Sequence, residues 1–177
     1  MTAPHCVDDA SAVVNQFISS MLKAFDPNSE CPPLGGGSTT VRFFAGDGAL
    51  PSWNPHGTGC DEPMLWVRVA HRYRSKIGSF PTAYVGDASC GNADIRRALA
   101  VEVGVGRCTT MDANPDWDTL SQEAEISLDD SWRIEQVLCH AAKRLQSPQR
   151  AVAIDTVAPF GPEGGLIAWT GIAYVQL

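Results

Sequence analysis

The residues that could do chemistry in this sequence do not have the spacing of a catalytic motif. A hydrolase needs a nucleophile, a histidine base and an acid that orients the base. Ser89 lies in the run GDASCG at 86–91, which differs from the G-x-S-x-G nucleophile elbow. The histidines have no spacing that would place two of them on one helix face or on adjacent strand positions. These are His5, His56, His71 and His140. The sequence therefore predicts neither an enzyme nor a metal site.

Glycine-rich segments could in principle cradle a phosphate. Gly35-Gly36-Gly37-Ser38 lacks the G-K-[ST] ending of a phosphate loop, so we expect a flexible loop there. Gly104 and Gly106 lie within a predicted strand rather than before a helix, which excludes the dinucleotide fingerprint and favours close packing. The sequence predicts no cofactor.

The cysteines are widely spaced and form no C-x-x-C pair, which argues against zinc and against a redox couple. They are Cys6, Cys31, Cys60, Cys90, Cys108 and Cys139. The N-terminal residues MTAPHCVDDA lack the basic-then-apolar pattern of a signal peptide. We therefore expect a cytosolic chain with free thiols, buried as small apolar groups. A bridge between Cys60 and Cys90 is the alternative under oxidising conditions.

The charge is unevenly distributed along the chain. The net charge is -7, and the window 109–132 contains acidic residues but no Lys or Arg. Its acids are Asp112, Asp116, Asp118, Glu123, Glu125, Asp129 and Asp130. Such a block argues against a surface that grips phosphates, because affinity for nucleic acids depends on Lys and Arg. A solvated helix face is the plainer explanation.

The N-terminal third predicts one helix followed by loops. Apolar residues recur at helical spacing over 9–25, with Asp8 or Asp9 as the cap. Residues 26–63 are rich in Pro, Gly, Ser and Asn, with one predicted strand at 39–45. Loops of that length in a compact domain are often functional or order against a partner.

Two segments in the middle of the chain alternate as strands do. In 64–75, Leu65, Val67, Val69, His71 and Tyr73 share one face. The other face, carrying Trp66, Arg68, Arg72 and Arg74, is predicted to be wet and basic. We expect 97–108 to pair antiparallel with this strand, so that Glu102 faces one of its arginines at an exposed position.

The basic and aromatic stripe is the first candidate interface. Trp66, Arg68, Arg72 and Arg74, extended by Lys76, could bind a nucleic acid or an acidic protein surface. Alternatively, the acidic helix layer covers this face. We favour an acidic partner surface, such as the 116–130 block of an adjacent copy.

Three further helices are expected, one between these two strands and two after them. The first is a short helix at 92–96. The second spans 116–125, with Asn114 as its cap and Pro115 at its first position. The third begins at Ser127 and ends near Lys143 and Arg144, with a predicted buried side. That side consists of Leu128, Trp132, Val137, Leu138, Ala141 and Leu145.

The last segment, 151–177, predicts a hairpin that turns at 161–165. Its final strand is apolar on both faces, with Ile167, Trp169, Val175 and Leu177 on one and Leu166, Ile172 and Tyr174 on the other. One helix layer covers one face, so loops or a second subunit must cover the other. Trp169, Tyr174 and Leu177 therefore join the candidate interface residues.

Length and composition favour a single α+β domain, an antiparallel or mixed sheet flanked by an N-terminal helix and a helix before the C-terminal hairpin. The chain has 177 residues, of which 44% are hydrophobic, enough for a proper core. The segment 26–63 is a loop-rich insertion in this domain. No run of about 18 apolar residues is present, so we expect no membrane span.

Three phrases, LWVRVAHRYRS, RALAVEVGVGRC and PFGPEGGLIAWTGIAYVQL, resemble neck proteins of long-tailed phages that infect actinobacteria, in particular the tail terminator type. The resemblance covers residues 64–177. It implies a virion protein, assembled in the host cytoplasm, that forms a ring of six copies. The ring would cap the tail tube and dock it onto the head-to-tail connector or stopper, while DNA passes through the channel without specific binding.

Other functions fit the same sequence. Within the virion, the chain could be another connector ring, such as a stopper or adaptor, or a tail tube subunit. In a different class, a small cytosolic enzyme or ligand-binding domain would use the 26–63 loops as a lid over a pocket.

Overall fold

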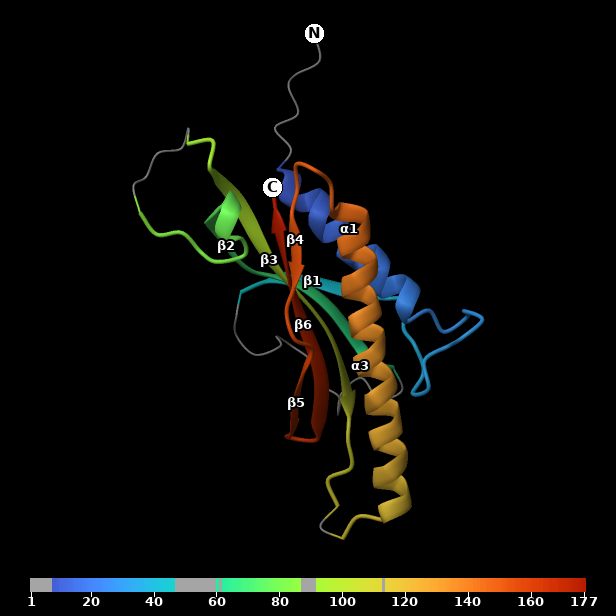
Figure 1. Ribbon diagram of the computed structural model, residues 1–177. Coiled ribbons are helices and arrows are strands. Elements are labelled where there is room, and N and C mark those ends of the chain that lie inside the picture. Colours follow the sequence, from blue (N-terminus) through green and yellow to red (C-terminus); the bar gives the residue numbers. More distant parts are fainter. Residues whose placement is uncertain (1–7, 47–59, 61, 87–91, 113) are drawn as a thin grey trace.

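A computed structural model of the chain describes residues 8–46, 60, 62–86, 92–112 and 114–177. Within these residues, six strands form one mixed sheet, and two α-helices pack against it (Figure 1). The predicted α+β class is confirmed. The segments 47–59 and 61 of the loop-rich insertion lie outside the described residues, as do His5, His56, Cys6, Ser89 and Cys90.

Helix α1 spans Asp9–Ala24, as its apolar spacing predicts. The Asp8 carboxylate accepts a hydrogen bond from the backbone N–H of Ala10 at 3.2 Å and caps the helix. Val13, Phe17 and Met21 lie on the buried side and are fully inaccessible to solvent. Strand β1 follows at Val41–Ala45.

Strands β2 (Met64–Lys76) and β3 (Ile95–Cys108) form the predicted antiparallel pair at the centre of the sheet. β1 lies parallel to β2, outside this pair. A short 3-10 helix, η1, occupies Ile77–Ser79. The predicted helix at 92–96 is wrong: β3 begins at Ile95, because Ile95 and Arg96 pair with Lys76 and Ser75 across the ladder.

Helix α3 is one continuous helix over Trp117–Leu145, where the sequence predicted two. Its cap is Asp116, whose carboxylate accepts a hydrogen bond from the Thr119 N–H, rather than Asn114. Ser127 lies inside the helix, because the sequence from 117 to 145 contains no Gly or Pro to interrupt it. With 29 residues the helix is about 43 Å long. Its N-terminal part extends past the sheet (Figure 1).

The C-terminal strands are β4 (Val152–Ile154), β5 (Ala158–Glu163) and β6 (Leu166–Gln176). β6 pairs with β3 on one side and with β4 and β5 in succession on the other, giving the order β1-β2-β3-β6-β4. The predicted hairpin is present, and Gly164 and Gly165 at its tip have positive φ angles of 58° and 79°.

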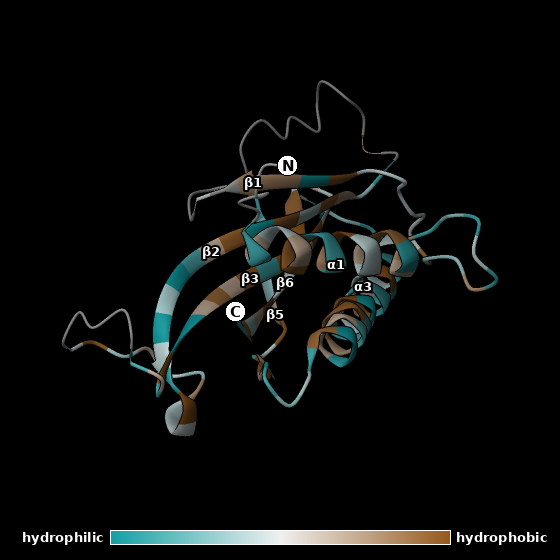
Figure 2. Ribbon diagram, turned by 90° about the horizontal axis from the view of Figure 1, so that it is seen from above, coloured by the Kyte–Doolittle hydropathy of each residue, from teal (hydrophilic) through white to brown (hydrophobic). Residues whose placement is uncertain are grey.

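The core lies between the two helices and one face of the sheet (Figure 2). Each element contributes its apolar face, with α1 packed on β2 and α3 packed on β6. Fully buried members include Phe17, Leu65, Val67, Leu99, Val101, Ile134, Leu138, Ala173 and Val175. On the opposite face, Met64, Trp66 and Ala168 form a second, smaller cluster against Phe44.

Candidate interaction surface

The predicted basic stripe on β2 does not form one face of the sheet. The register between β2 and β3 shifts between Val69 and His71, so a bulge reverses the alternation. Beyond it, Arg72 pairs with Leu99 and lies on the helix-covered face, whereas His71 and Tyr73 lie on the face of Trp66 and Arg68. The prediction that Trp66, Arg68, Arg72 and Arg74 share a face is therefore wrong.

Trp66 and Arg68, which form the first half of the stripe, both bind Glu102 of the same chain. The Trp66 side chain is 2% exposed, and its indole Nε1–H donates to Glu102 Oε1 at 3.0 Å. Arg68 donates to Glu102 Oε2 at 2.7 Å. The predicted contact between Glu102 and an arginine is therefore present. It is not at an exposed position, because the Arg68 side chain is 15% exposed and the Glu102 side chain 10%. Gly104 leaves room for the Trp66 ring, which a Cβ at this position would meet.

The second half of the stripe lies near the start of α1. Arg72 forms an ion pair with Asp8, and its hydrogen bond lowers the pKa of the Asp8 carboxyl, assisted by the Ala10 N–H. Arg74 is half-buried and lies opposite Arg97. Within the described chain, Arg68 thus pairs with Glu102 and Arg72 with Asp8.

Two acids of the 116–130 block bind arginines that hold the loop after α1. Arg107 donates to Asp130, and also to the carbonyls of Gly35 and Gly36. Arg133 donates to Asp129 and to the carbonyls of Ala24, Cys31 and Pro32. Burial raises the pKa of Asp130, and the Arg107 hydrogen bonds oppose that shift.

The glycine run at 35–38 is therefore a fixed loop, where the sequence predicted a flexible one. Gly37 packs against the backbone of Phe25, and Ser38 is 3% exposed. These contacts bring the loop against β3 and α3. None of the described residues in 26–46 lines either of the two grooves described below.

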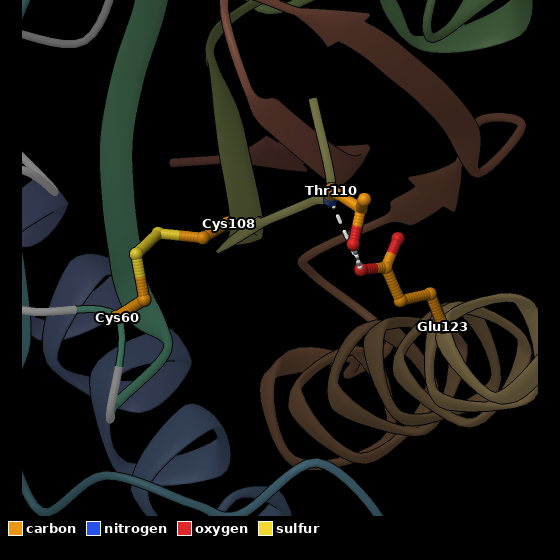
Figure 3. The surroundings of a disulfide bond; sticks show 4 residues. All are labelled: Cys60, Cys108, Thr110 and Glu123. Carbon is orange, nitrogen blue, oxygen red and sulfur yellow. Dashed lines mark hydrogen bonds between the residues drawn. A yellow bond between two sulfur atoms is a disulfide. The ribbon is translucent and has the colours of Figure 1, made fainter. Parts of the chain in front are cut away.

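The segment between β3 and α3 is held by a disulfide and by hydrogen bonds to one glutamate (Figure 3). Cys60 is bonded to Cys108, so the prediction of free thiols is wrong at these positions, as is the alternative partner Cys90. The free Cys31 and Cys139 are exposed rather than buried. Partial burial would raise the pKa of Glu123, but hydrogen bonds from Thr110 and Thr109 lower it overall.

The sheet face away from the helices carries a small polar cluster. A groove of about 430 Å³ contains His71, Tyr73, Asp155 and Tyr174, and the Tyr174 hydroxyl donates to Asp155 at 3.1 Å. Burial raises the pKa of Tyr73 to about 12, and that of Tyr174 is also raised by burial, so both stay protonated at neutral pH. The Thr156 N–H and the Tyr174 hydroxyl lower the pKa of Asp155.

A larger groove lies between the outer side of α3 and the strands β4 and β6. Its volume is about 840 Å³, and its walls are mainly apolar. The residues that line it are Leu128, Ser131, Trp132, Glu135, Cys139, Ile154, Asp155, Thr156, Val157 and Trp169. The Trp169 indole donates to Ser127 Oγ at 2.7 Å, which fixes the floor of the groove.

The apolar walls of this groove are open to solvent. Leu128 is 69% exposed, Trp132 49% and Ile154 42%. The sequence placed Leu128 and Trp132 on the buried side of their helix, which is wrong, because Asp130, Arg133 and Ile134 are buried there instead. The other residues predicted for that side are buried, namely Val137, Leu138, Ala141 and Leu145. Continuing the helical spacing back to Trp117, which is 78% exposed, would have revealed a second apolar stripe.

The remaining candidate residues lie in different places. Trp169 lines the larger groove and Tyr174 the smaller one. Leu177 is half-buried against the core. The structure therefore brings together Trp169 with Trp132 and Leu128, a combination that the sequence did not indicate.

The sequence matches no protein-family model and no curated protein. In the described residues, no helix has both the length and the apolar character for crossing a membrane. The same part of the chain holds no group of three or more His, Cys, Asp or Glu residues arranged for a metal ion.

Proposed function

We propose that this protein is a structural subunit of a phage neck, of the tail terminator type. Copies assemble into a ring that caps the tail tube and joins it to the head-to-tail connector. The proposal is supported by the resemblance of three segments, which correspond to β2, β3 and the β5–β6 hairpin. These strands are neighbours in the sheet, so the resemblance covers one contiguous part of the fold.

The observation that carries the proposal is the open groove beside α3. Leu128, Trp132 and Ile154 expose large apolar side chains around one depression. Contiguous exposed apolar surface of this kind is typical of a protein–protein interface. A subunit of an assembly covers such a surface with its neighbour, whereas an isolated domain leaves it in water.

The distribution of charge supports a channel that DNA passes without binding. The chain carries a net charge of -7. Arg68, Arg107 and Arg133 are committed to carboxylates of the same chain, and their guanidinium groups are mostly buried. A surface of this kind offers few cations to displace the counterions of DNA, so phosphate contacts stay weak.

The mass of the purified protein in solution tests this proposal. Light scattering, combined with negative-stain images of the same fraction, is expected to give a multimer of about six copies with a central hole. A chain that stays monomeric at every concentration, alone and in the presence of purified tail tubes, would contradict it.

Binding partners separate the tail terminator from the other virion roles. A terminator ring is expected to bind the end of preformed tail tubes and to stop further polymerisation of the tube protein in a sedimentation assay. A stopper or adaptor ring would instead bind head connectors and leave tube growth unchanged. A tube subunit would polymerise into open-ended tubes by itself.

A further inference from the structure

The smaller groove, on the face of the sheet away from the helices, lies over small residues that are flanked by aromatic ones. His71 and Tyr73 of β2 and Tyr174 of β6 line it. Between them, Ala100 of β3 pairs with His71 on one side and with Tyr174 on the other. Ala98 pairs with Tyr73 in the same way. Directly paired residues lie on the same face, so the two alanines leave space between the larger side chains.

The aromatic rings meet above these alanines. The ring centroids of Tyr73 and Tyr174 are 6.2 Å apart, although β3 separates their strands, and the rings are perpendicular at 89°. The His71 ring lies 5.3 Å from that of Tyr73. Ala98 and Ala100 beneath them are almost fully buried, at 1% and 0% exposure. Rings inclined to one another present more than one aromatic surface to a group that enters the groove.

A fixed carboxylate lies in the same groove. The backbone N–H of Asp155 donates to the Ile172 carbonyl at 2.9 Å, which holds the residue against β6. Its carboxylate accepts hydrogen bonds from the Thr156 N–H at 2.7 Å and from the Tyr174 hydroxyl at 3.1 Å. These bonds lower the pKa of Asp155, so it is ionised at neutral pH. A carboxylate has about four acceptor positions, so others remain for a ligand.

The loop after η1 forms another part of the rim, at residues 81–83. The Ser75 hydroxyl donates to the Thr82 carbonyl at 2.8 Å, and the Tyr84 N–H donates to the Arg74 carbonyl at 2.7 Å. These bonds tie the loop to the end of β2. The groove is therefore formed before a ligand arrives, and its volume of about 430 Å³ is in the range of small-molecule sites.

The charge of the groove favours a cation. Among the described residues that line it, Asp155 is the one carboxylate, and there is no Lys or Arg. The faces of tyrosine rings also attract cations. The net charge of the chain, -7, acts in the same direction over longer distances. A phosphate or a carboxylate would be repelled by Asp155.

The acceptors in the groove favour a cation that carries N–H groups. The Tyr73 hydroxyl oxygen is buried and has no hydrogen-bond partner among the described residues. Such hydroxyls are uncommon in folded proteins, and a bound water or ion is one reason for them. Burial raises the pKa of Tyr73 to about 12, so the oxygen stays a neutral acceptor. A primary ammonium has three N–H donors for these acceptors, whereas a quaternary ammonium has none.

We propose that this groove binds a primary ammonium group. The Asp155 carboxylate is its counter-ion, and the rings of His71, Tyr73 and Tyr174 are its walls. The group is the end of a small free amine or of a lysine side chain of a protein, since the two present the same chemistry. The site lies within one chain, so it does not depend on the ring assembly proposed above.

Titration with n-butylammonium chloride, which has the same terminal group as a lysine side chain, tests the site. The chain contains three tyrosines, so NMR of a sample labelled in the tyrosine rings reports on each of them. The Tyr73 and Tyr174 signals are expected to shift together with a Kd of about 1–10 mM. Tyr84 is the internal control, because it does not line the groove and Lys76 already lies 4.8 Å from its ring centroid. Equal shifts of all three signals, or none, would overturn the proposal.

Three isosteric probes test the chemistry of the ligand. n-Butanol lacks the charge and butyrate reverses it, so both are expected to bind at least about tenfold more weakly than n-butylammonium. n-Butyltrimethylammonium keeps the charge but has no N–H group, and it is expected to bind about fivefold more weakly. Equal binding of n-butanol would exclude a cation site, and equal binding of n-butyltrimethylammonium would overturn the assignment to a primary ammonium.

The Asp155→Asn variant tests the counter-ion. Asparagine keeps an oxygen that can accept from Thr156 and Tyr174, so the change removes the charge and retains the geometry. We expect the affinity for n-butylammonium to fall about fivefold. Asp118→Asn, at an exposed acid on α3 outside the groove, is the matched control and should leave the affinity unchanged. No loss in Asp155→Asn, or the same loss in both variants, would overturn the role of Asp155.

Two variants of Tyr174 test the aromatic wall, with the Tyr73 signal as the readout. Tyr174→Leu removes the ring and is expected to weaken binding about fivefold. Tyr174→Phe keeps the ring but loses the hydrogen bond to Asp155, and it is expected to stay within about twofold of the unmodified chain. Circular dichroism and the melting temperature check that both variants fold. Equal losses in the two variants would contradict the role of the ring.

Two further ligands distinguish the sources of the ammonium group. Cadaverine represents a free amine, and the tripeptide acetyl-Gly-Lys-Gly-amide represents a lysine side chain of a protein. Tighter binding of cadaverine would assign the site to a free amine, and tighter binding of the tripeptide to a protein lysine. Failure of both to shift the Tyr73 and Tyr174 signals would overturn the proposal, whatever the oligomeric state of the chain.

Discussion

The inner and outer sides of α3 use the same kinds of residue for different purposes. On the inner side, Ile134 and Leu138 are fully buried against the sheet, and Arg133 is neutralised by Asp129. On the outer side, Leu128 and Trp132 are apolar but exposed, and the acids beside them have no cationic neighbours in the groove lining. The inner side is buried by other elements of the same chain, whereas in our proposal the outer side is buried by a partner.

This comparison predicts that substitutions on the two sides of α3 affect different properties of the protein. Changes on the inner side should lower the free energy of unfolding of the single subunit. Changes on the outer side should leave that free energy nearly unchanged and act on assembly. The following predictions test the division, beginning with the largest expected effect.

Among these substitutions, the replacement of Arg107, which binds the loop at 35–38, should lower the stability of the subunit most. Arg107→Ala leaves Asp130 buried without its partner and deprives the Gly35 and Gly36 carbonyls of their donor. We expect a loss of about 3–5 kcal/mol in the free energy of unfolding, measured by urea denaturation. Arg96→Ala, an exposed arginine on the same strand, is the control and should cost less than about 0.5 kcal/mol. Similar losses in both variants would contradict the role of Arg107.

Two leucines on α3 allow a matched comparison of its two sides. Leu138→Ala removes a fully buried side chain and should cost about 2–5 kcal/mol, because it leaves a cavity against β6. Leu128→Ala, at a 69% exposed position, should change the free energy of unfolding by less than about 0.5 kcal/mol. Guanidinium unfolding of both variants under monomeric conditions measures the difference. Equal costs would show that the outer side belongs to the fold.

The disulfide should stabilise the subunit by restricting the unfolded chain. Cys60 and Cys108 are separated by 48 positions, so opening the bond should cost about 2–4 kcal/mol. Thermal unfolding with and without reductant measures this loss in the unmodified chain. A Cys60→Ser variant should show no further change with reductant, whereas Cys31→Ser should respond like the unmodified chain.

The hydrogen bonds to Glu123 should give a small, pH-dependent contribution. Because its pKa is lowered in the folded state, Glu123 stabilises the fold above its ordinary pKa, and this contribution is lost as the pH falls through the folded-state value. Replacing Thr109 and Thr110 by Val should therefore cost about 1 kcal/mol at pH 7 and progressively less at acidic pH. Urea midpoints at a series of pH values measure this, with Thr40→Val as an exposed control. A cost independent of pH would exclude the carboxylate as its source.

Local sequence patterns predicted most of the elements. The helical spacing and the Asp8 cap located α1, and the alternation in 64–75 and 97–108 located β2, β3 and their pairing. The α+β class followed from the order of these elements. Propensity failed at 92–96, where pairing with β2 outweighs the local preference for a turn or helix.

The sequence identified only some of the residues that line the larger groove beside α3. Trp169 was identified because the last strand is apolar on both faces, and it does line the groove. Trp132 and Leu128 were assigned to the core because helical spacing gives the angle of a side chain around the axis but not the direction of the sheet. Which of two apolar stripes on α3 is buried depends on where β6 lies.

The sequence by itself determined the amphipathic helix, the central strands and their alternation, since these depend on residues within a few positions of one another. Only the tertiary structure decided that the bulge after Val69 separates Arg72 from Arg68, that Cys60 meets Cys108, and that Glu102 and Asp8 serve as the partners of the β2 arginines. These contacts join positions 34 or more residues apart along the chain. Their formation depends on how whole elements pack, which no short window of sequence specifies.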